Sequence, residues 1–352
     1  MIAQKLKNKP FWYPYSMDFR GRVYPCSPHL SHIGDDVSRG LLRFSLGKKL
    51  GPKGLDWIKI HLINLCGTHK RKSNSDRLKA ANDVISEVID SAVNPFDLEV
   101  KRKEDAKNGV EEAILLEGLL SRKVIKQTVM TTVYGVTQYG GTLQILRELK
   151  NLEKLPPQNI KSCAAYLSKL TLGSIGEIFA SATNIQNWFI ELSSNISRLR
   201  KANISWKTPM NFIVKQPYFA DDSDILKSDC LKNKNAFPPN FIHSLDSTHM
   251  MLTALSCWEK NITFVSVHDC FWTHACDVDE MNKICREEFV KLHSQPILEN
   301  LSDYLLEKYQ FQINPNENDN GRKIAFNKLL KNIPKKGTFD IREVLDSTYF
   351  FS

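Results

Sequence analysis

The stretch from Arg122 to Gly135, RKVIKQTVMTTVYG, constrains this chain most, because its spacing predicts a single helix that carries chemistry along its length. Arg122 and Lys126 are four residues apart and therefore neighbours on one helix face. Tyr134 lies about 12 Å further along the axis than Lys126 and about 80° around it. This layout suits a nucleoside triphosphate, with cations at its phosphates and a phenol at its sugar. A solvated basic helix with a buried tyrosine has the same spacing.

Composition sets broad limits on the class of protein. The 352 residues are 42% hydrophobic and 25% charged, which is typical of one large globular domain or two. The net charge of +9 is compatible with a polyanionic partner. Eight cysteines without a CxxC pair indicate reduced thiols. No apolar run approaches the ~20 residues that cross a bilayer, and the first residues lack the apolar core of a secretory signal, so no membrane partner is expected.

An aromatic and proline-rich segment, residues 11–25 (FWYPYSMDFRGRVYP), predicts a strand and a turn. Arg20 and Arg22 flank Gly21 in this turn. Arginines beside a glycine can hold phosphate while the backbone packs closely. An ordinary turn with surface arginines is the alternative that the local pattern leaves open.

The second half of the chain predicts a hairpin, a loop and a helix in succession. Residues 205–218 (SWKTPMNFIVKQPY) are typical of a β-hairpin, and residues 219–236 of an irregular polar loop. Pro238 and the residues after it predict a helix start with Asn240 as the N-cap. This helix would carry His243.

A second hairpin is predicted over residues 263–273 (TFVSVHDCFWT), with His268 and Asp269 at its tip. An exposed carboxylate held at a hairpin tip suits a Mg²⁺ ligand. Two groups of side chains contain residue types that bind zinc: His243, Asp246 and His249 on the predicted helix, and His268, Cys270, His274 and Cys276 around the hairpin. Neither has the spacing of a tetrahedral site, so we favour a single histidine that reaches a ligand.

Taken in order, these segments resemble the single-subunit, phage-type RNA polymerases, and in particular their mitochondrial branch. MDFRGRVYPC resembles the DxxGR element, RKVIKQTVMTTVYG the motif B helix, FPPNFIHSLDSTHM the helix that enters the second half of the palm, and VSVHDCFWTHA motif C. The final STYFFS is similar to the end of the mitochondrial branch.

The resemblance implies roles in catalysis and substrate binding for matching positions. Asp269 would bind the catalytic Mg²⁺ ions, and Lys126 would contact the incoming phosphates and donate a proton to the pyrophosphate leaving group. Arg122 would hold the triphosphate, Tyr134 would sense the sugar, and His243 would contact the ribose 2′-OH. These roles agree with the residue types, because cations stabilise phosphate charge and a carboxylate holds a metal.

Contacts with nucleic acid are implied for Arg20 and Arg22. The expected partners are a DNA template, an RNA transcript, ribonucleoside triphosphates and mitochondrial transcription factors, in the mitochondrial matrix. The implied fold is α+β and mostly helical, a right-hand polymerase with a small antiparallel palm sheet. Its expected parts are the first part of the palm (1–100), the fingers (101–236, with the motif B helix at 122–135 and a shortened promoter-reading loop), and the second part of the palm with motif C and the C-terminal tail (237–352).

One departure from the family concerns the second metal-binding aspartate. Two-metal nucleotidyl transfer needs more than one carboxylate, because the ions lie about 3.5–4 Å apart. In this family motif A, a DGSxxGxQH-like string, supplies it, and no such string precedes Arg122. The family would place it between Asp90 and Glu117, where Asp97 and Asp105 lack the required neighbours. We therefore expect an incomplete palm sheet and impaired catalysis.

Three functions remain to be weighed. The first is the catalytic region of a DNA-directed RNA polymerase for mitochondrial transcription. The second is a non-catalytic nucleic-acid-binding remnant or splice form of that polymerase. The third, a family A DNA polymerase, shares the motif B pattern but is disfavoured, because Cys270 follows Asp269 where those enzymes usually carry glutamate.

Overall fold

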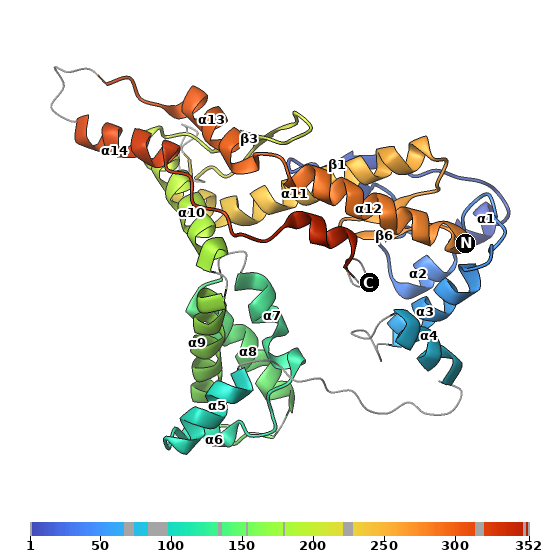
Figure 1. The fold of residues 1–352 in the computed structure, drawn as a ribbon, viewed down its shortest axis with the longest axis horizontal. Coiled ribbons are helices and arrows are strands. Elements are labelled where there is room, and N and C mark those ends of the chain that lie inside the picture. The colour runs from blue at the N-terminus through green and yellow to red at the C-terminus, as the bar shows by residue number, and fades with distance from the viewer. Residues whose placement is uncertain are drawn as a thin grey trace.

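A computed structural model of the chain describes residues 2–66, 74–83, 98–132, 136–152, 154–178, 180–220, 228–313, 320–347 and 350 (Figure 1). Most residues in these ranges are helical, and their strands form three two-stranded antiparallel sheets. The mostly helical α+β class predicted from the sequence is thus confirmed. No helix within these ranges is long and apolar enough to cross a membrane.

A helical module hangs below the rest of the chain in Figure 1. It consists of α5 (Leu98–Lys107), α6 (Glu111–Leu115), α7 (Arg122–Thr132), α8 (Gln138–Leu152) and α9 (Ile160–Ile178). Its core gathers buried aliphatic side chains from successive helices, including Leu116, Val124, Ile145, Leu149 and Leu167. Ile145 and Leu149 on α8 are four residues apart, as are Cys163 and Leu167 on α9, and this spacing gives each of these helices one apolar face. The module therefore has a core of its own.

Helix α7 confirms the helix predicted from Arg122, over the part of that stretch that the structure describes. Val124, Ile125 and Thr128 are buried on one face, while Lys126 is exposed on another. Residues 133–135, which include Tyr134, lie outside the described residues. The burial of Val124 and Ile125 explains why α7 packs against α8 and α9.

The principal core lies where α10 (Ala180–Leu199) crosses α11 (Cys230–Glu259). Strands β3 (Ser205–Lys207) and β4 (Ile213–Lys215) form the predicted hairpin, with Trp206 paired to Val214 and both fully buried. Helices α13 (Ile297–Tyr309) and α14 (Asn320–Lys331) close this core. Elements α10, β3 and β4 therefore share their core with the C-terminal helices.

Helix α11 corrects two sequence predictions. It begins at Cys230 with Asp229 as its N-cap, whose side chain accepts a hydrogen bond from the Lys232 amide at 2.9 Å. It then continues through Pro238 and Pro239. The helix start predicted at Pro238 was wrong, and so was the loop assigned up to residue 236. The predicted cap, Asn240, is instead a buried mid-helix residue. Packing of the flanking turns outweighs the backbone hydrogen bonds that the prolines cannot donate.

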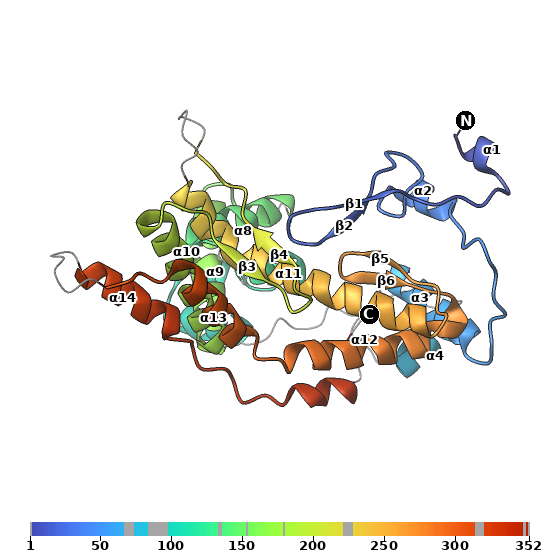
Figure 2. The same ribbon diagram turned by 90° about the horizontal axis from the view of Figure 1, so that it is seen from above.

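The other end of α11 supports two short hairpins (Figure 2). Strands β1 (Tyr15–Met17) and β2 (Val23–Pro25) pair antiparallel, and so do β5 (Val265–Val267) and β6 (Cys270–Trp272). The β5–β6 hairpin was predicted from the sequence and is confirmed, whereas for residues 11–25 the sequence predicted only a strand and a turn. The remaining elements in this region are α1 (Ile2–Leu6), α2 (Asp36–Gly40), α3 (Gly54–Cys66), α4 (Asn74–Asp83), η1 (Ala275–Asp277), α12 (Val278–His293) and η2 (Ile341–Leu345).

Candidate functional site

The turn of the β1–β2 hairpin lies directly on α11. The Asp18 amide donates to the Arg22 carbonyl at 2.9 Å, and the Gly21 amide donates to the Asp18 carbonyl at 3.0 Å. Gly21 has a φ of +90°, which disfavours any side chain there. A Cβ at this position would also lie 3.4 Å from the Cβ of Ser247 on α11. The glycine is therefore needed for the backbone conformation of a turn that packs on α11.

Asp18 organises the turn through both carboxylate oxygens. Its Oδ1 accepts from the backbone amides of Arg20 at 2.9 Å and Arg22 at 3.0 Å. Its Oδ2 accepts from Nε and Nη2 of Arg20, at 2.9 and 2.6 Å. Burial acts to raise the pKa of Asp18, but these hydrogen bonds outweigh it and hold the pKa below its usual value. The carboxylate therefore stays ionised and fixes the Arg20 guanidinium.

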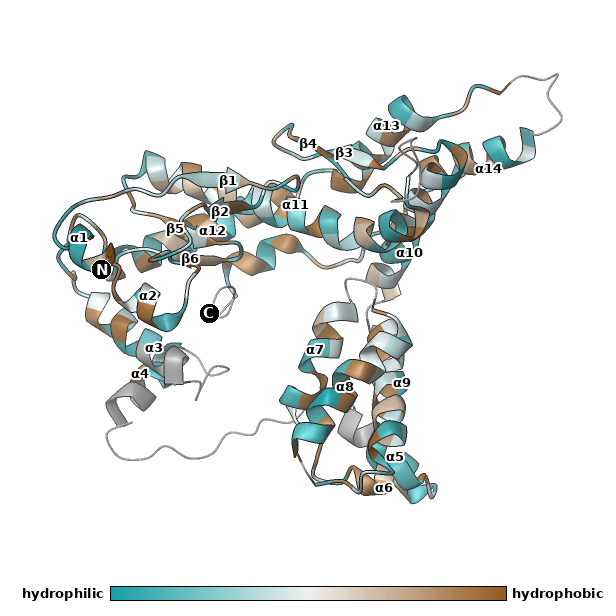
Figure 3. Cartoon of the chain, turned by 180° about the vertical axis from the view of Figure 1, so that it is seen from behind, coloured by the Kyte–Doolittle hydropathy of each residue, from teal (hydrophilic) through white to brown (hydrophobic). Residues whose placement is uncertain are grey.

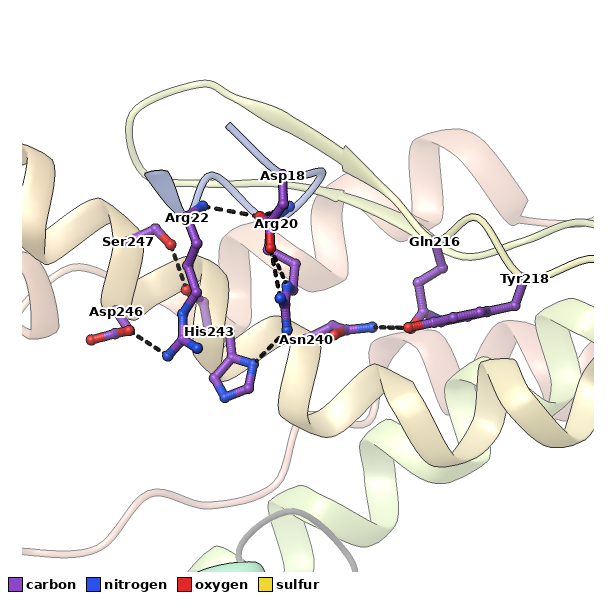
Figure 4. Close-up of polar contacts among 9 residues, drawn as sticks. All are labelled: Asp18, Arg20, Arg22, Gln216, Tyr218, Asn240, His243, Asp246 and Ser247. Atoms are coloured by element: carbon purple, nitrogen blue, oxygen red, sulfur yellow. Dashed lines mark hydrogen bonds and ion pairs between the residues drawn. The ribbon is translucent and has the colours of Figure 1, made fainter. Parts of the chain in front are cut away.

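The third nitrogen of the Arg20 guanidinium contacts His243 (Figure 4). Nη1 of Arg20 lies 3.0 Å from Nδ1 of His243, which projects from α11. Burial, followed by the charges of Arg22 and Arg20, lowers the pKa of His243 to about 4. The imidazole is therefore neutral at physiological pH. Two residues 223 positions apart in sequence are joined at this point.

Arg22 makes a second link between the hairpin and α11. Its Nη2 donates to Oδ2 of Asp246 at 2.8 Å, and both side chains are mostly buried, at 17% and 23% exposed. Its Nε is buried without a hydrogen-bond partner in the described part of the chain. A buried guanidinium nitrogen that lacks a partner is costly, so this contact between the hairpin and α11 is not fully satisfied.

Asp269 lies at the tip of the β5–β6 hairpin, which contacts strand β2 of the first hairpin. His268 precedes it with a φ of +55°, and the His268 ring meets the edge of Tyr24 on β2, with ring centroids 4.9 Å apart. Burial and then the charge of Arg22 lower the pKa of His268. The Asp269 side chain is exposed at the tip. The β1–β2 hairpin and α11 thus bring Arg20, Arg22 and His243 together, and His268, the residue before Asp269, packs against the same hairpin.

The donor set of this site does not fit a two-metal centre. Asp18 is hydrogen-bonded to Arg20 and the turn, and Asp246 is paired with Arg22, which leaves Asp269 as an exposed carboxylate beside them. Across all described residues, no group of three His, Cys, Asp or Glu side chains is placed to hold a metal ion. The family nevertheless implies divalent metal use.

The remaining predicted residues are not gathered here. Lys126 lies on α7 in the helical module, away from β5–β6, as Figures 1 and 3 show from opposite sides. Arg122 is the first residue of α7, but its side chain lies outside the described part of the structure. The whole of Tyr134 also lies outside it. Asp97 also lies outside the described residues. Asp105 accepts a hydrogen bond from the Tyr166 hydroxyl at 2.5 Å and so helps to hold the helical module together.

Sequence reasoning gave no structural role to the two carboxylates that hold the arginines. The D-x-R-x-R spacing around Asp18 could have indicated local pairing, because alternate residues at a tight turn converge. Asp246 had been considered only as a zinc ligand, but its position three residues after His243 places both on one side of α11. A nearby network was also missed, in which Nδ2 of Asn240 donates to Oε1 of Gln216 at 3.0 Å and to the Tyr218 hydroxyl at 3.2 Å (Figure 4).

Known proteins resemble this chain along its whole length. A family model described as DNA-dependent RNA polymerase matches residues 48–102 and 97–352. The mitochondrial DNA-directed RNA polymerase of Mus musculus is 39% identical over 100% of this chain and 37% of its own length. The corresponding protein of Homo sapiens is 38% identical, over 100% of this chain and 36% of its own. That of Schizosaccharomyces pombe is 34% identical, over 100% of this chain and 41% of its own.

The chain therefore spans well under half the length of these relatives. The alignment with the mouse protein is 453 positions long, about 101 more than the 352 residues of this chain. Relatives thus have internal residues without a counterpart here. The two family-model matches meet at residues 97–102, which places a discontinuity inside the interval from 90 to 117. This chain belongs to the DNA-dependent RNA polymerase family, in its phage-type branch with the mitochondrial enzymes.

Proposed function

We propose that the chain is part of the catalytic region of a mitochondrial DNA-directed RNA polymerase. The observation that supports this most is the joining of the DxxGR hairpin to α11 and to the motif C hairpin. Arg20, Arg22 and His243 meet in that arrangement, and His268, the residue before Asp269, packs against Tyr24 of the DxxGR hairpin. It offers cations for a nucleic-acid backbone, a neutral imidazole for a sugar and a carboxylate for a metal.

The proposed substrates are ribonucleoside triphosphates, added to an RNA transcript on a DNA template. Arg122 and Lys126 would hold the triphosphate from α7, and Lys126 would pass a proton to the departing pyrophosphate. Tyr134 would lie at the sugar. Asp269 would hold Mg²⁺, the hard cation that favours carboxylate oxygens and triphosphates. Mitochondrial transcription factors are proposed as protein partners, because the relatives carry mitochondrial names.

The proposed arrangement of domains follows the family. The first part of the palm would be residues 1–100, the fingers 101–236, and the second part of the palm 237–352. Closure of the fingers on the palm would bring Lys126 toward Asp269 once substrate binds.

Catalysis by this exact chain is proposed to be impaired. The extra positions in the mouse alignment and the family-model discontinuity near residue 100 support the loss of the segment that carries the second aspartate. Neither Asp18 nor Asp246 is a substitute, since each is engaged by an arginine. A gene-model error, a splice form or a degenerate paralogue would each produce such a chain.

Extension of an RNA primer on a DNA template by the purified chain tests this proposal. We expect little extension by the chain itself. Extension should be restored when the relatives' internal segment is inserted near residue 100, and Asp269→Asn should then abolish it. Asp303→Asn, a change of the same kind at an exposed carboxylate on α13, is the matched control. Incorporation of deoxyribonucleotides in preference to ribonucleotides would indicate a DNA polymerase instead.

Efficient extension by the unmodified chain would contradict the missing-segment argument. Absence of template-dependent extension even after insertion would contradict the catalytic proposal. The second candidate, a nucleic-acid-binding remnant, would then take first place. It is favoured specifically by the missing second aspartate of motif A, together with the net charge of +9. Such a remnant would bind DNA with steep salt dependence.

A further inference from the structure

We propose that Arg20 is a positioning residue that holds His243 as the tautomer with its hydrogen on Nε2, so that the ring presents an N–H donor to a ribose hydroxyl. The part of this inference that concerns ribose rests on the proposed function. The part that concerns the tautomer rests on the contacts among Asp18, Arg20 and His243.

The tautomer follows from the hydrogen-bonding capacity of the two groups. A guanidinium has five N–H donors and no acceptor, and it stays protonated in proteins. At 3.0 Å from Nη1 of Arg20, the Nδ1 atom of His243 must therefore be the acceptor. A neutral imidazole has one acceptor nitrogen and one N–H nitrogen. The hydrogen must then lie on Nε2.

Arg20 can impose this choice because its own position is fixed. Asp18 accepts from Nε and Nη2 of the guanidinium and from the Arg20 backbone amide. Asp18 is held in turn by the tight turn that ends at Arg22. The two-point pairing fixes the plane of the guanidinium, so Nη1 is directed at α11. A lysine at this position would give a single flexible donor.

The charged groups around His243 favour the neutral ring. Arg20 and Arg22 of the β1–β2 hairpin face the ring, and Asp18 is paired with Arg20. Asp246 on α11 is paired with Arg22. His268 at the tip of the β5–β6 hairpin is also close to the ring. A proton on Nδ1 would point at the Arg20 guanidinium and remove the acceptor. The arrangement thus disfavours both the imidazolium and the tautomer with its hydrogen on Nδ1.

A fixed N–H donor distinguishes ribose from deoxyribose. The ribose 2′-oxygen can accept from Nε2–H of His243, whereas deoxyribose offers no acceptor there. A site built to hydrogen-bond a hydroxyl discriminates against the analogue that lacks it, because a protein group loses its partner. Without Arg20, the ring could turn an acceptor toward the sugar instead. We therefore assign part of the ribose preference to Arg20.

The tautomer is measured by NMR on the full chain with ¹⁵N-labelled histidine, and His243→Gln identifies the His243 signals. We expect a pyrrole-type Nε2 and a pyridine-type Nδ1 in the wild-type chain. In Arg20→Met both nitrogens should shift toward exchange-averaged values, and the pH at which the ring titrates should rise. Arg342 on η2 pairs with Asp340, two residues before it, as Arg20 pairs with Asp18. Arg342→Met is therefore the matched control. It should leave His243 unchanged.

A pyrrole-type Nδ1 in the wild-type chain would overturn the inference, as would His243 signals that Arg20→Met leaves unchanged. Ribose selectivity is measured separately, as the ratio of the Kd values for dATP and ATP. We expect this ratio to fall about five-fold in Arg20→Met, the value of one ordinary hydrogen bond, and to stay constant in Arg342→Met.

The two readouts separate failure of this inference from failure of the proposed function. If the wild-type chain binds neither nucleotide, the proposed function and the ribose role both fail, while NMR still decides the tautomer. If both nucleotides bind and the ratio does not change in Arg20→Met, the ribose role is overturned, even where the tautomer is as expected.

Discussion

Replacement of Gly141 by alanine tests how closely α8 packs in the helical module. A Cβ at this position would lie 2.8 Å from Oγ of Ser168 on α9 and 3.0 Å from Cγ2 of Thr128 on α7. Both contacts are shorter than van der Waals packing allows, and the Ser168 hydroxyl donates to the Gln138 carbonyl at 3.1 Å. One methyl group should therefore force three helices apart.

The expected magnitude follows from three terms, two unfavourable and one favourable. Overpacking of a filled core costs about 1–3 kcal/mol. Alanine gains about 1 kcal/mol over glycine in a helix interior. Disruption of the hydrogen bond from Ser168 costs about 1 kcal/mol more. Gly141→Ala should thus destabilise the module by about 1–3 kcal/mol.

Hydrogen exchange of peptides from α8 and α9 measures this effect locally. Amides that exchange by opening of the module should do so about 5- to 150-fold faster, since each 1.4 kcal/mol is a factor of ten. Gly173→Ala on α9 is the matched control, because no atom lies within 4 Å of its added Cβ. It should stabilise the module by about 1 kcal/mol.

Ser168→Ala removes the nearest clashing atom, so it should partly rescue Gly141→Ala. The reasoning would be refuted if Gly141→Ala slowed exchange as much as Gly173→Ala does. It would also be refuted if Ser168→Ala gave no rescue in the double variant.

Three further outcomes follow from the site and its surroundings. A double-mutant cycle with Arg22→Met and Asp246→Asn should give a coupling of about 1 kcal/mol in the free energy of unfolding, because the ion pair is mostly but not fully buried. Additive effects of the two changes on urea unfolding would contradict the ion pair. Burial lowers the pKa of His243 and of His293 to about 4, below the usual 6.5, so the unfolded chain binds more protons than the folded chain between pH 4 and 6.5. The free energy of unfolding should therefore fall as the pH drops from 6.5 to 4, and His293→Gln should reduce this pH dependence. The pKa of Asp18 is lowered by folding, so its contribution to the free energy of unfolding is present above pH 3.8 and is lost below its folded-state pKa. Asp18→Asn should reduce the free energy of urea unfolding by about 1–2 kcal/mol at neutral pH and by less at pH 3.

Local patterns predicted the hairpins because the relevant physics is local. Alternating apolar residues and turn residues set β3–β4 and β5–β6, and the turn of β3–β4 contains Asn211 with a φ of +66°. The same reasoning failed at Pro238, where proline usually starts a helix. Buried neighbours such as Phe237, which is fully buried, hold α11 continuous through that position.

For the candidate site, the residue types were predictable and their pairing was not. The motifs identified Arg20, Arg22, His243 and Asp269 from spacing and resemblance. That Arg20 meets His243 and Arg22 meets Asp246 depends on where one hairpin lies against α11. Gly21, with a φ of +90°, allows the turn between the two arginines that other residues would adopt only with strain.

The sequence by itself determined the family, the helical module's apolar faces and the turns, because these depend on short-range spacing and backbone preferences. Tertiary structure alone decided the partners of the charged groups, the neutral state of His243 and the separation of Lys126 from Asp269. The physical reason is that a pKa or an ion pair depends on burial and on charges from distant segments. Those distances are fixed only when the cores that carry the segments have packed.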